Sequence, residues 1–489
     1  MDQLAVKCRK GLMCILENEA LFLLAAFLLR GILFVDTLKW YMEDLTRLYT
    51  YVLCPWGGAL IGLRLARLGQ KKSGSEMPVL FLLFIWITVP LLWRFGPTFN
   101  NIVTDIGYAI VFFGVYASIR EREETVRERR LFEMGVLFTV LSIIWCGLLL
   151  YCAVTGKQIG EDTGGLPFGV FRGFLFAGIH YNSVGMMAIG CLFMSMALFA
   201  CGKRALLRAA GVAGAVLAAL VIILSQSRTS RYAMLIALAF GAFMKMWVWP
   251  GMKNGGIRKI LAVLCAAMVL AGGYALSGLI TRAALAHYEK LAGQTGTQTG
   301  QTAESVQESE TQNGEGILQG VAETMVASAA AESDMTGKSR EAVDATFSDR
   351  TNIWRNLFDL WRGDLKKMLM GRGVGNTGRL IAHDTIHEAE GSAAVHNTYL
   401  QFMADFGLIG FMLQAAFLLC ILPRLFRGVS YGAEHGESGL LSMGMLVVAV
   451  LLIGLMESAP LGQMTPTNLV LYPALAFLTA KGETLVKQK

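Results

Sequence analysis

Three arginines carry the first chemical signal in the sequence. Arg228 and Arg231 lie in the segment SQSRTSR between two long apolar runs, and Arg350 lies in SDRTNIW. Guanidinium groups bind phosphate oxygens bidentately and stay charged at any working pH. If the three side chains share one membrane face, they form an anion site. The alternatives are arginines that extend to lipid headgroups, for Arg228 and Arg231, and a surface ion pair with a neighbouring aspartate, for Arg350.

The second signal is His396, which directly precedes an apolar run that begins at Asn397. Imidazole is the side chain that titrates closest to neutral pH, so a histidine at a membrane surface can act as a general base toward a hydroxyl group. The alternative is an interfacial histidine beside Asn397, with Asn397 capping the helix that follows.

Three further polar segments are candidates for ligand contacts. In FAGIHYNSVG, Asn182 either lines a cavity or caps a helix. The glycines of GRGVGNTG, Gly373 and Gly375 among them, form a flexible loop that can approach a ligand closely. His383 and His387 would share one face of a helix and resemble metal ligands. Their spacing matches no zinc-protease pattern, so we expect a solvated loop and no metal there.

The elements that must position these residues are apolar. Of the 489 residues, 54% are hydrophobic and only 16% charged, and the mean hydropathy is +0.51. These values exclude a soluble enzyme, a disulfide scaffold and a disordered protein. Continuous apolar runs close to the length that crosses a bilayer predict an all-α integral membrane protein. The expected transmembrane helices are the following twelve: Glu19–Thr37, Leu48–Ala66, Met77–Trp93, Asn101–Ile119, Met134–Val154, Tyr181–Ala200, Ala205–Leu224, Ser230–Trp249, Ile260–Ile280, Asn397–Leu422, Gly439–Ser458 and Met464–Ala480.

The positions of Lys and Arg predict how these helices are oriented. Basic residues gather in alternate connections, starting with the N-terminal segment, as the positive-inside rule requires. We therefore expect both termini in the cytoplasm and Arg228, Arg350 and His396 on the outer face. The net charge of +7 then reflects topology and gives no indication of nucleic-acid binding. We expect no cleavable signal peptide, and the nine cysteines show neither metal-ligand spacing nor a disulfide framework.

One connection is much longer than the others. Nine helices within residues 1–280 are followed by an outer segment, 281–396, and by three helices within 397–489. Residues 293–337 are rich in Gln, Thr, Ser, Glu and Gly, which predicts a disordered or weakly helical insert. Residues 348–396 differ, since they open with an amphipathic helix that lies in the membrane interface or over the bundle. Its expected cap is Ser348 or Asp349, and its apolar face holds Ile353, Leu357, Leu360 and Trp361.

Taken in order, these motifs resemble the O-antigen ligase and polysaccharide polymerase superfamily of membrane glycosyltransferases. The matching features are Asn182, SQSR at Arg228, R-x-x-x-W at Arg350 with the glycines Gly371, Gly373 and Gly375, and HNTYLQ…GLIG from His396 to Gly410. The resemblance runs from about Arg172 to Gly410. The layout of twelve helices with a large outer segment late in the chain is similar too.

The resemblance implies glycan transfer on the outer face of the cytoplasmic membrane. The donor would be a glycan linked by diphosphate to a polyprenyl lipid such as undecaprenol, and the acceptor another glycan, a glycolipid or a glycoprotein. The implied fold is related to the GT-C glycosyltransferases, and the reaction is inverting, without a metal or other cofactor. The implied roles are as follows: Arg228 and Arg350 bind the donor diphosphate, His396 is the base, and Arg231, Asn182, Gly373, Gly375 and Asn397 contact substrate.

Two other functions fit parts of the sequence. A transporter or flippase of lipid-linked saccharides also uses about twelve helices. Transporters, however, place ionisable residues midway through the bilayer and contain related halves. Here Arg30 is the one basic residue deep in a predicted helix, and no internal repeat is evident. A metal-dependent hydrolase that uses His383 and His387 is the third possibility.

Overall fold

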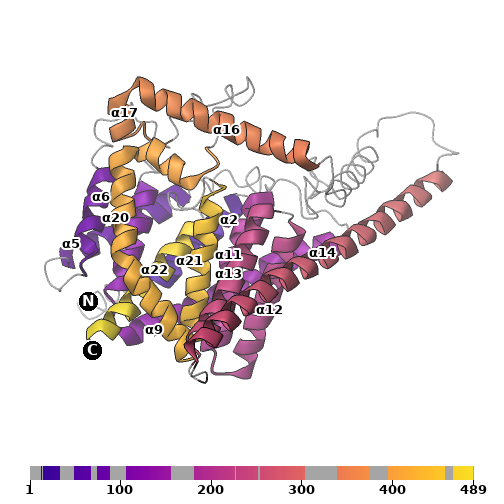
Figure 1. Ribbon diagram of the computed structural model, residues 1–489, viewed down its shortest axis with the longest axis horizontal. Coiled ribbons are helices and arrows are strands. Elements are labelled where there is room, and N and C mark those ends of the chain that lie inside the picture. Colours follow the sequence, from indigo (N-terminus) through magenta and orange to yellow (C-terminus); the bar gives the residue numbers. More distant parts are fainter. Residues whose placement is uncertain are drawn as a thin grey trace, which may run out of the picture.

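The protein is a bundle of helices. The computed structural model describes residues 11, 13, 15–33, 49–67, 74–88, 106–155, 181–225, 227–249, 251, 254–302, 339–374, 395–457 and 466–487. Within these residues the regular structure is helical throughout, and no strand occurs (Figure 1). This follows from the apolar sequence, because in a bilayer every backbone N–H and C=O must be paired within the segment.

Each predicted transmembrane run contains a helix. The elements in chain order are α2 (Glu19–Leu33), the π-helical turn η1 (Tyr49–Leu53), α5 (Cys54–Arg67), α6 (Met77–Thr88), η3 (Ile110–Val115), α8 (Tyr116–Arg120), α9 (Glu124–Leu141), η4 (Ser142–Cys146), α10 (Gly147–Thr155), α11 (Tyr181–Cys201), α12 (Ala205–Leu224), α13 (Arg228–Trp247), α14 (Gly255–Thr302), α16 (Ser339–Gly363), α17 (Leu365–Met370), α20 (Thr398–Glu434), α21 (Ser438–Gly454) and α22 (Pro466–Lys487). In the described part of the chain, six helices are long and apolar enough to cross a membrane, and shorter apolar helices accompany them. The prediction of an all-α integral membrane protein is confirmed.

Burial separates central helices from peripheral ones. In the most apolar stretches, 78% of the residues of α11 and 72% of those of α22 are buried, against 11% for α14. Helix α14 therefore turns most of its surface outward, and in Figure 1 it extends well beyond the bundle. It also continues to Thr302, past the end expected at Ile280. The first part of the predicted insert, 293–302, is thus helical, and the remainder of that insert lies outside the described residues.

Helix α16 lies across one end of the bundle (Figure 1), here named the α16 end. The predicted apolar face is confirmed, because Ile353, Leu357 and Trp361 are buried together against Val395 and Ala404. The predicted cap is wrong. The helix begins at Ser339, so residues 348 and 349 lie inside it and cannot cap its start.

Helix α20 is broken near the α16 end. Gly407 has φ 74° and ψ 177°, a conformation open to glycine and strained for other residues. The apolar pattern predicts one uninterrupted helix here. The structure instead has a short arm, Thr398 to Phe406, ahead of the long transmembrane arm. The break positions the short arm beneath α16, where its residues Leu400, Met403 and Ala404 contact the apolar face of that helix.

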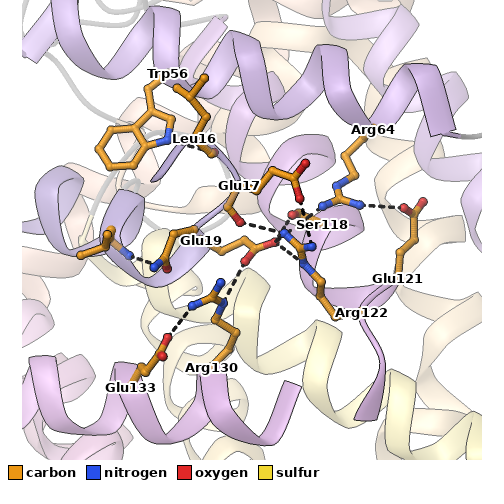
Figure 2. Close-up of polar contacts among 12 residues, drawn as sticks. Leu16, Glu17, Glu19, Trp56, Arg64, Ser118, Glu121, Arg122, Arg130 and Glu133 are labelled. Carbon is orange, nitrogen blue, oxygen red and sulfur yellow. Dashed lines mark hydrogen bonds and ion pairs between the residues drawn. The ribbon is translucent and has the colours of Figure 1, made fainter. Parts of the chain in front are cut away.

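The opposite end of the bundle is held by buried ion pairs (Figure 2). Glu19 has no exposed surface and accepts hydrogen bonds from the hydroxyl of Ser118 and from Nε of Arg122 at 2.9 Å. Arg130 Nε lies 3.2 Å from its second carboxylate oxygen, and Arg64 Nη2 lies 3.7 Å from the first. One carboxylate therefore joins α2 to α5, α8 and α9.

The carboxylates keep this cluster charged. Burial lowers the pKa of Arg122, but the nearby carboxylates of Glu19 and Glu17 outweigh burial, so the pKa is raised above the ordinary arginine value. Glu121 and Glu133 pair with Arg64 and Arg130 in the same region. The cluster thus balances its positive charge locally, which is what buried charges require.

Replacing Glu19 by alanine is expected to destabilise the bundle. Removing one partner of a buried ion pair costs about 3–5 kcal/mol, and we expect the lower end because each arginine keeps a second carboxylate. The melting temperature of the detergent-solubilised protein should fall by several degrees. The exposed Glu128 supplies the control, since Glu128→Ala should melt with the wild type. Equal melting of Glu19→Ala and the wild type would contradict a structural role for the cluster.

Candidate functional site

Segments that lie far apart in the sequence meet at the α16 end. They are the start of α11 with Asn182, the α12–α13 turn with Ser227, α16 with Arg350, the residue before the α20 cap, His396, and the segment after α21 with Glu457. Asn182 and Glu457 are 275 positions apart and share a hydrogen bond. The helices of the bundle bring these residues together, because α11 and α21 pack side by side.

Glu457 is at the centre of this cluster. It is 7% exposed, and Nδ2 of Asn182 donates to its Oε1 at 2.7 Å. Arg350 Nη2 lies 3.7 Å from the same oxygen, and His396 Nδ1 lies 3.8 Å from Oε2. The hydroxyl of Thr398 donates to the backbone carbonyl of Glu457 at 2.6 Å. Two residues predicted for opposite roles in catalysis thus contact one buried carboxylate.

The sequence interpretation missed Glu457. A signal was present, since Glu457 is the only acidic residue in the predicted run Gly439–Ser458 and lies near its C-terminal end. Ionisable residues within predicted transmembrane segments are frequently functional. The partners of Glu457, however, are separated from it by whole helices, so no local pattern indicates them.

His396 has an unusual backbone conformation. Its φ is 50°, the one positive φ of a non-glycine residue among the described residues, and such a conformation costs about 1–3 kcal/mol. Its side chain is 38% exposed, while its Nδ1 is buried and has no hydrogen-bond partner within the described part of the chain. The ring therefore has one nitrogen on the buried side facing Glu457 and an exposed portion elsewhere.

Asn397 holds this conformation in place. Its Oδ1 accepts from the backbone N–H groups of Tyr399 and Leu400, at 3.0 and 3.1 Å, so the predicted helix cap is confirmed. Its Nδ2 donates to the carbonyl of Leu455 at 3.1 Å. The amide thus joins the start of α20 to the end of α21, next to His396. Substrate contact by Asn397 stays a prediction.

The SQSR turn is attached to α11 through Asn182. Ser227 Oγ donates to Asn182 Oδ1 at 2.7 Å and also caps α13 by accepting from the N–H of Ser230. A methyl group added to Gly185 would lie 2.5 Å from Ser230 Oγ, so this contact requires a glycine on α11. Asn182 therefore bridges the arginine-bearing turn and Glu457.

The three predicted arginines occupy different surroundings. Arg350 lies beside Glu457, and its Nη1 donates to Met456 Sδ at 3.6 Å. Arg228 begins α13 directly after Ser227 and is exposed. Arg231 is 6% exposed, and its guanidinium carbon lies 5.6 Å from the centre of the Tyr232 ring. Arg228 is thus at the edge of the cluster, whereas Arg231 lies within the bundle.

The glycine motif packs against the broken helix. Gly371 has φ 83°, and a methyl group there would lie 2.3 Å from the carbonyl oxygen of Asp405. The N–H groups of Arg372 and Gly373 donate to Ala404 and Asp405 at 2.9 Å, which satisfies carbonyls at the end of the short α20 arm. Gly373 therefore has a structural partner, and a role in substrate binding stays a prediction.

Other candidate sites add little to this cluster. Gly375, His383 and His387 lie outside the described residues. Among the residues that are described, no three His, Cys, Asp or Glu side chains gather as metal ligands would. A cavity of about 850 Å³ lies between α9, α22 and the connections that precede α12 and α21. It is at the opposite end of the bundle and separate from the Glu457 cluster.

A comparison with known protein families found a match to part of the chain. Residues 213–415 match the family model for O-antigen ligase, and no curated protein sequence matches the chain significantly. The matched region begins in α12, ends in α20 and contains Arg228, Arg350 and His396. Asn182 and Glu457 lie on either side of it and contact it. Over residues 213–415 this integral membrane protein is similar to the O-antigen ligase family, which supports a ligase or polymerase of cell-surface polysaccharide biosynthesis.

Proposed function

We propose that this protein transfers a glycan from polyprenyl diphosphate to a hydroxyl group of an acceptor glycan. The observation that carries the proposal is the Glu457 cluster. It joins Arg350, which suits a diphosphate leaving group, to His396, which suits the acceptor hydroxyl, through one carboxylate. A flippase would need neither a general base nor a fixed relation between that base and the phosphate ligand.

The chemistry follows from these two groups. His396 takes the proton of the acceptor hydroxyl, and the oxygen attacks the anomeric carbon of the donor sugar. The bond from this carbon to the diphosphate oxygen breaks, and the diphosphate leaves with the electron pair. Arg350, with Arg228 at the edge of the cluster, stabilises the charge that develops on the phosphate oxygens. A single displacement inverts the anomeric centre, and no step in it requires a metal.

The proposed orientation places the α16 end outside the cytoplasmic membrane. Basic residues support it, since Arg64, Arg120, Arg122, Arg130 and Lys481 all form ion pairs at the opposite end. This is the side that the positive-inside rule assigns to the cytoplasm. Both termini would then be cytoplasmic, and a polyprenyl diphosphate could enter the cluster from the outer leaflet.

Purified protein in lipid nanodiscs tests the function. With a polyprenyl-diphosphate-linked glycan and an acceptor glycan from the same cell surface, we expect release of one polyprenyl diphosphate for each glycan transferred, measured by mass spectrometry. Chelation of divalent ions should leave the rate unchanged. Restoration of a chelated, inactive sample by a divalent ion would contradict metal independence. If the protein instead moved the donor across liposome membranes without consuming it, a flippase would be the better description.

A further inference from the structure

We propose that Glu457 is a positioning residue that couples donor binding at Arg350 to the action of His396 as a base. The inference rests on the proposed glycan transfer and adds to it a residue and an order of events. Nothing in the motifs of the family region predicts it, because Glu457 lies outside the matched residues.

The Glu457 carboxylate is held more closely by Asn182 than by Arg350 or His396. Asn182 holds Oε1 at 2.7 Å, and Thr398 holds the backbone carbonyl at 2.6 Å. In contrast, Arg350 and His396 lie 3.7 and 3.8 Å away. These distances are ion-pair contacts and exceed those of hydrogen bonds. Glu457 is therefore a fixed carboxylate between the guanidinium of Arg350 and the imidazole of His396, and neither group is hydrogen-bonded to it.

Burial assigns the roles within this trio. Glu457 is 7% exposed and His396 is 38% exposed, so the imidazole can meet an acceptor and the carboxylate cannot. His396 faces Oε2 with Nδ1, which leaves Nε2 as the nitrogen that accepts a proton. A carboxylate behind the imidazole stabilises, through its charge, the imidazolium that forms when His396 takes the proton.

The position of Arg350 adds the coupling. Without donor, the charge of Glu457 is divided between Arg350 and His396. A diphosphate bound to Arg350 replaces Glu457 as the anionic partner of that guanidinium. The carboxylate then interacts with His396 alone. His396 therefore becomes a stronger base only after the donor, which carries the leaving group, has bound. This predicts that the donor binds before the acceptor.

Two substitutions separate this role from a structural one. Glu457→Gln keeps the shape and the oxygen that accepts from Asn182 but removes the charge. Glu457→Asp keeps the charge but shortens the side chain. We expect Glu457→Gln to lower kcat about 10- to 100-fold with the KM for the donor changed less than about threefold, and Glu457→Asp to retain more activity than Glu457→Gln. A carboxylate that serves only packing gives the reverse order.

Glu437 provides the matched control. Glu437 directly precedes α21, whereas Glu457 follows that helix, and the Glu437 side chain is partly exposed. Glu437→Gln should therefore transfer glycan at the wild-type rate. A folded Glu457→Gln with wild-type kcat, or with a change confined to KM, would overturn the inference. If Glu457→Gln does not fold, a folded but inactive Glu457→Asp would overturn it instead. Failure of the wild type to transfer glycan would reject the proposed function, a result distinct from these.

Discussion

Replacing His396 by alanine is expected to lower the kcat of glycan transfer about 10²- to 10⁴-fold, the usual contribution of a general base. The imidazole is the one group of the Glu457 cluster that is both exposed and able to accept a proton near neutral pH. Donor binding should change little, since the arginines remain. The measurement is the rate of polyprenyl diphosphate release at saturating donor, together with the Kd for the donor.

The chain supplies a matched control for this prediction. His435 follows α20 as His396 precedes it, and it stacks on Tyr431 at the opposite end of the bundle. His435→Ala should therefore leave kcat unchanged. Loss of activity in both variants would indicate a general effect on α20. If His396→Ala kept its kcat and lost only donor affinity, His396 would be a ligand of the donor and the base would have to be another group.

Backbone strain at His396 supports a functional reading of this position. A histidine with φ 50° is retained at a cost, and Asn397 compensates by capping α20 and binding the carbonyl of Leu455. The same amide thus fixes the distance between His396 and the segment that carries Glu457. A glycine at 396 would relieve the strain but would remove the imidazole, so the strain is consistent with a residue kept for its side chain.

Periodic features of this fold could be predicted, because they depend on short stretches of sequence. The spacing of Ile353, Leu357 and Trp361 indicated the buried face of α16, and Asn397 before an apolar run indicated a cap. Both are confirmed. The cap at Ser348 or Asp349 is wrong, since helical structure begins nine residues before Ser348, at Ser339.

Features that depend on distant contacts could not be predicted. The break at Gly407 interrupts a pattern, DFGLIGF, that continues the helix as far as hydropathy is concerned. It is stabilised from elsewhere, since Arg372 and Gly373 pair with carbonyls of the short arm and Trp86 Nε1 donates to the carbonyl of Phe406 at 2.8 Å. The surroundings of Glu457 likewise depend on Asn182, Arg350 and His396, which belong to three other segments of the chain.

Replacing Arg350 by alanine is expected to lower the kcat of transfer about 10³-fold and to weaken donor binding. Removing one group that stabilises developing charge costs about 10²- to 10³-fold, and a guanidinium on a phosphoryl group can contribute more. Arg350→Lys should recover only part of the loss, because an ammonium group retains the charge but cannot bind two phosphate oxygens in a fixed fork. Transfer rates and donor affinities of the three proteins, measured in the same nanodiscs, check this order.

Arg355 is the control that isolates position from charge. It lies on the same helix as Arg350 but is exposed on the face away from the bundle, so Arg355→Ala should bind donor and transfer glycan as the wild type does. Equal losses in the two alanine variants would point to a general effect of the charge of α16 on a negatively charged substrate. A loss confined to Arg350→Ala places the diphosphate at the Glu457 cluster, because Arg350 contacts Met456 and Glu457. The cluster would then have to hold both the leaving group and the base, which a purely structural ion pair does not require.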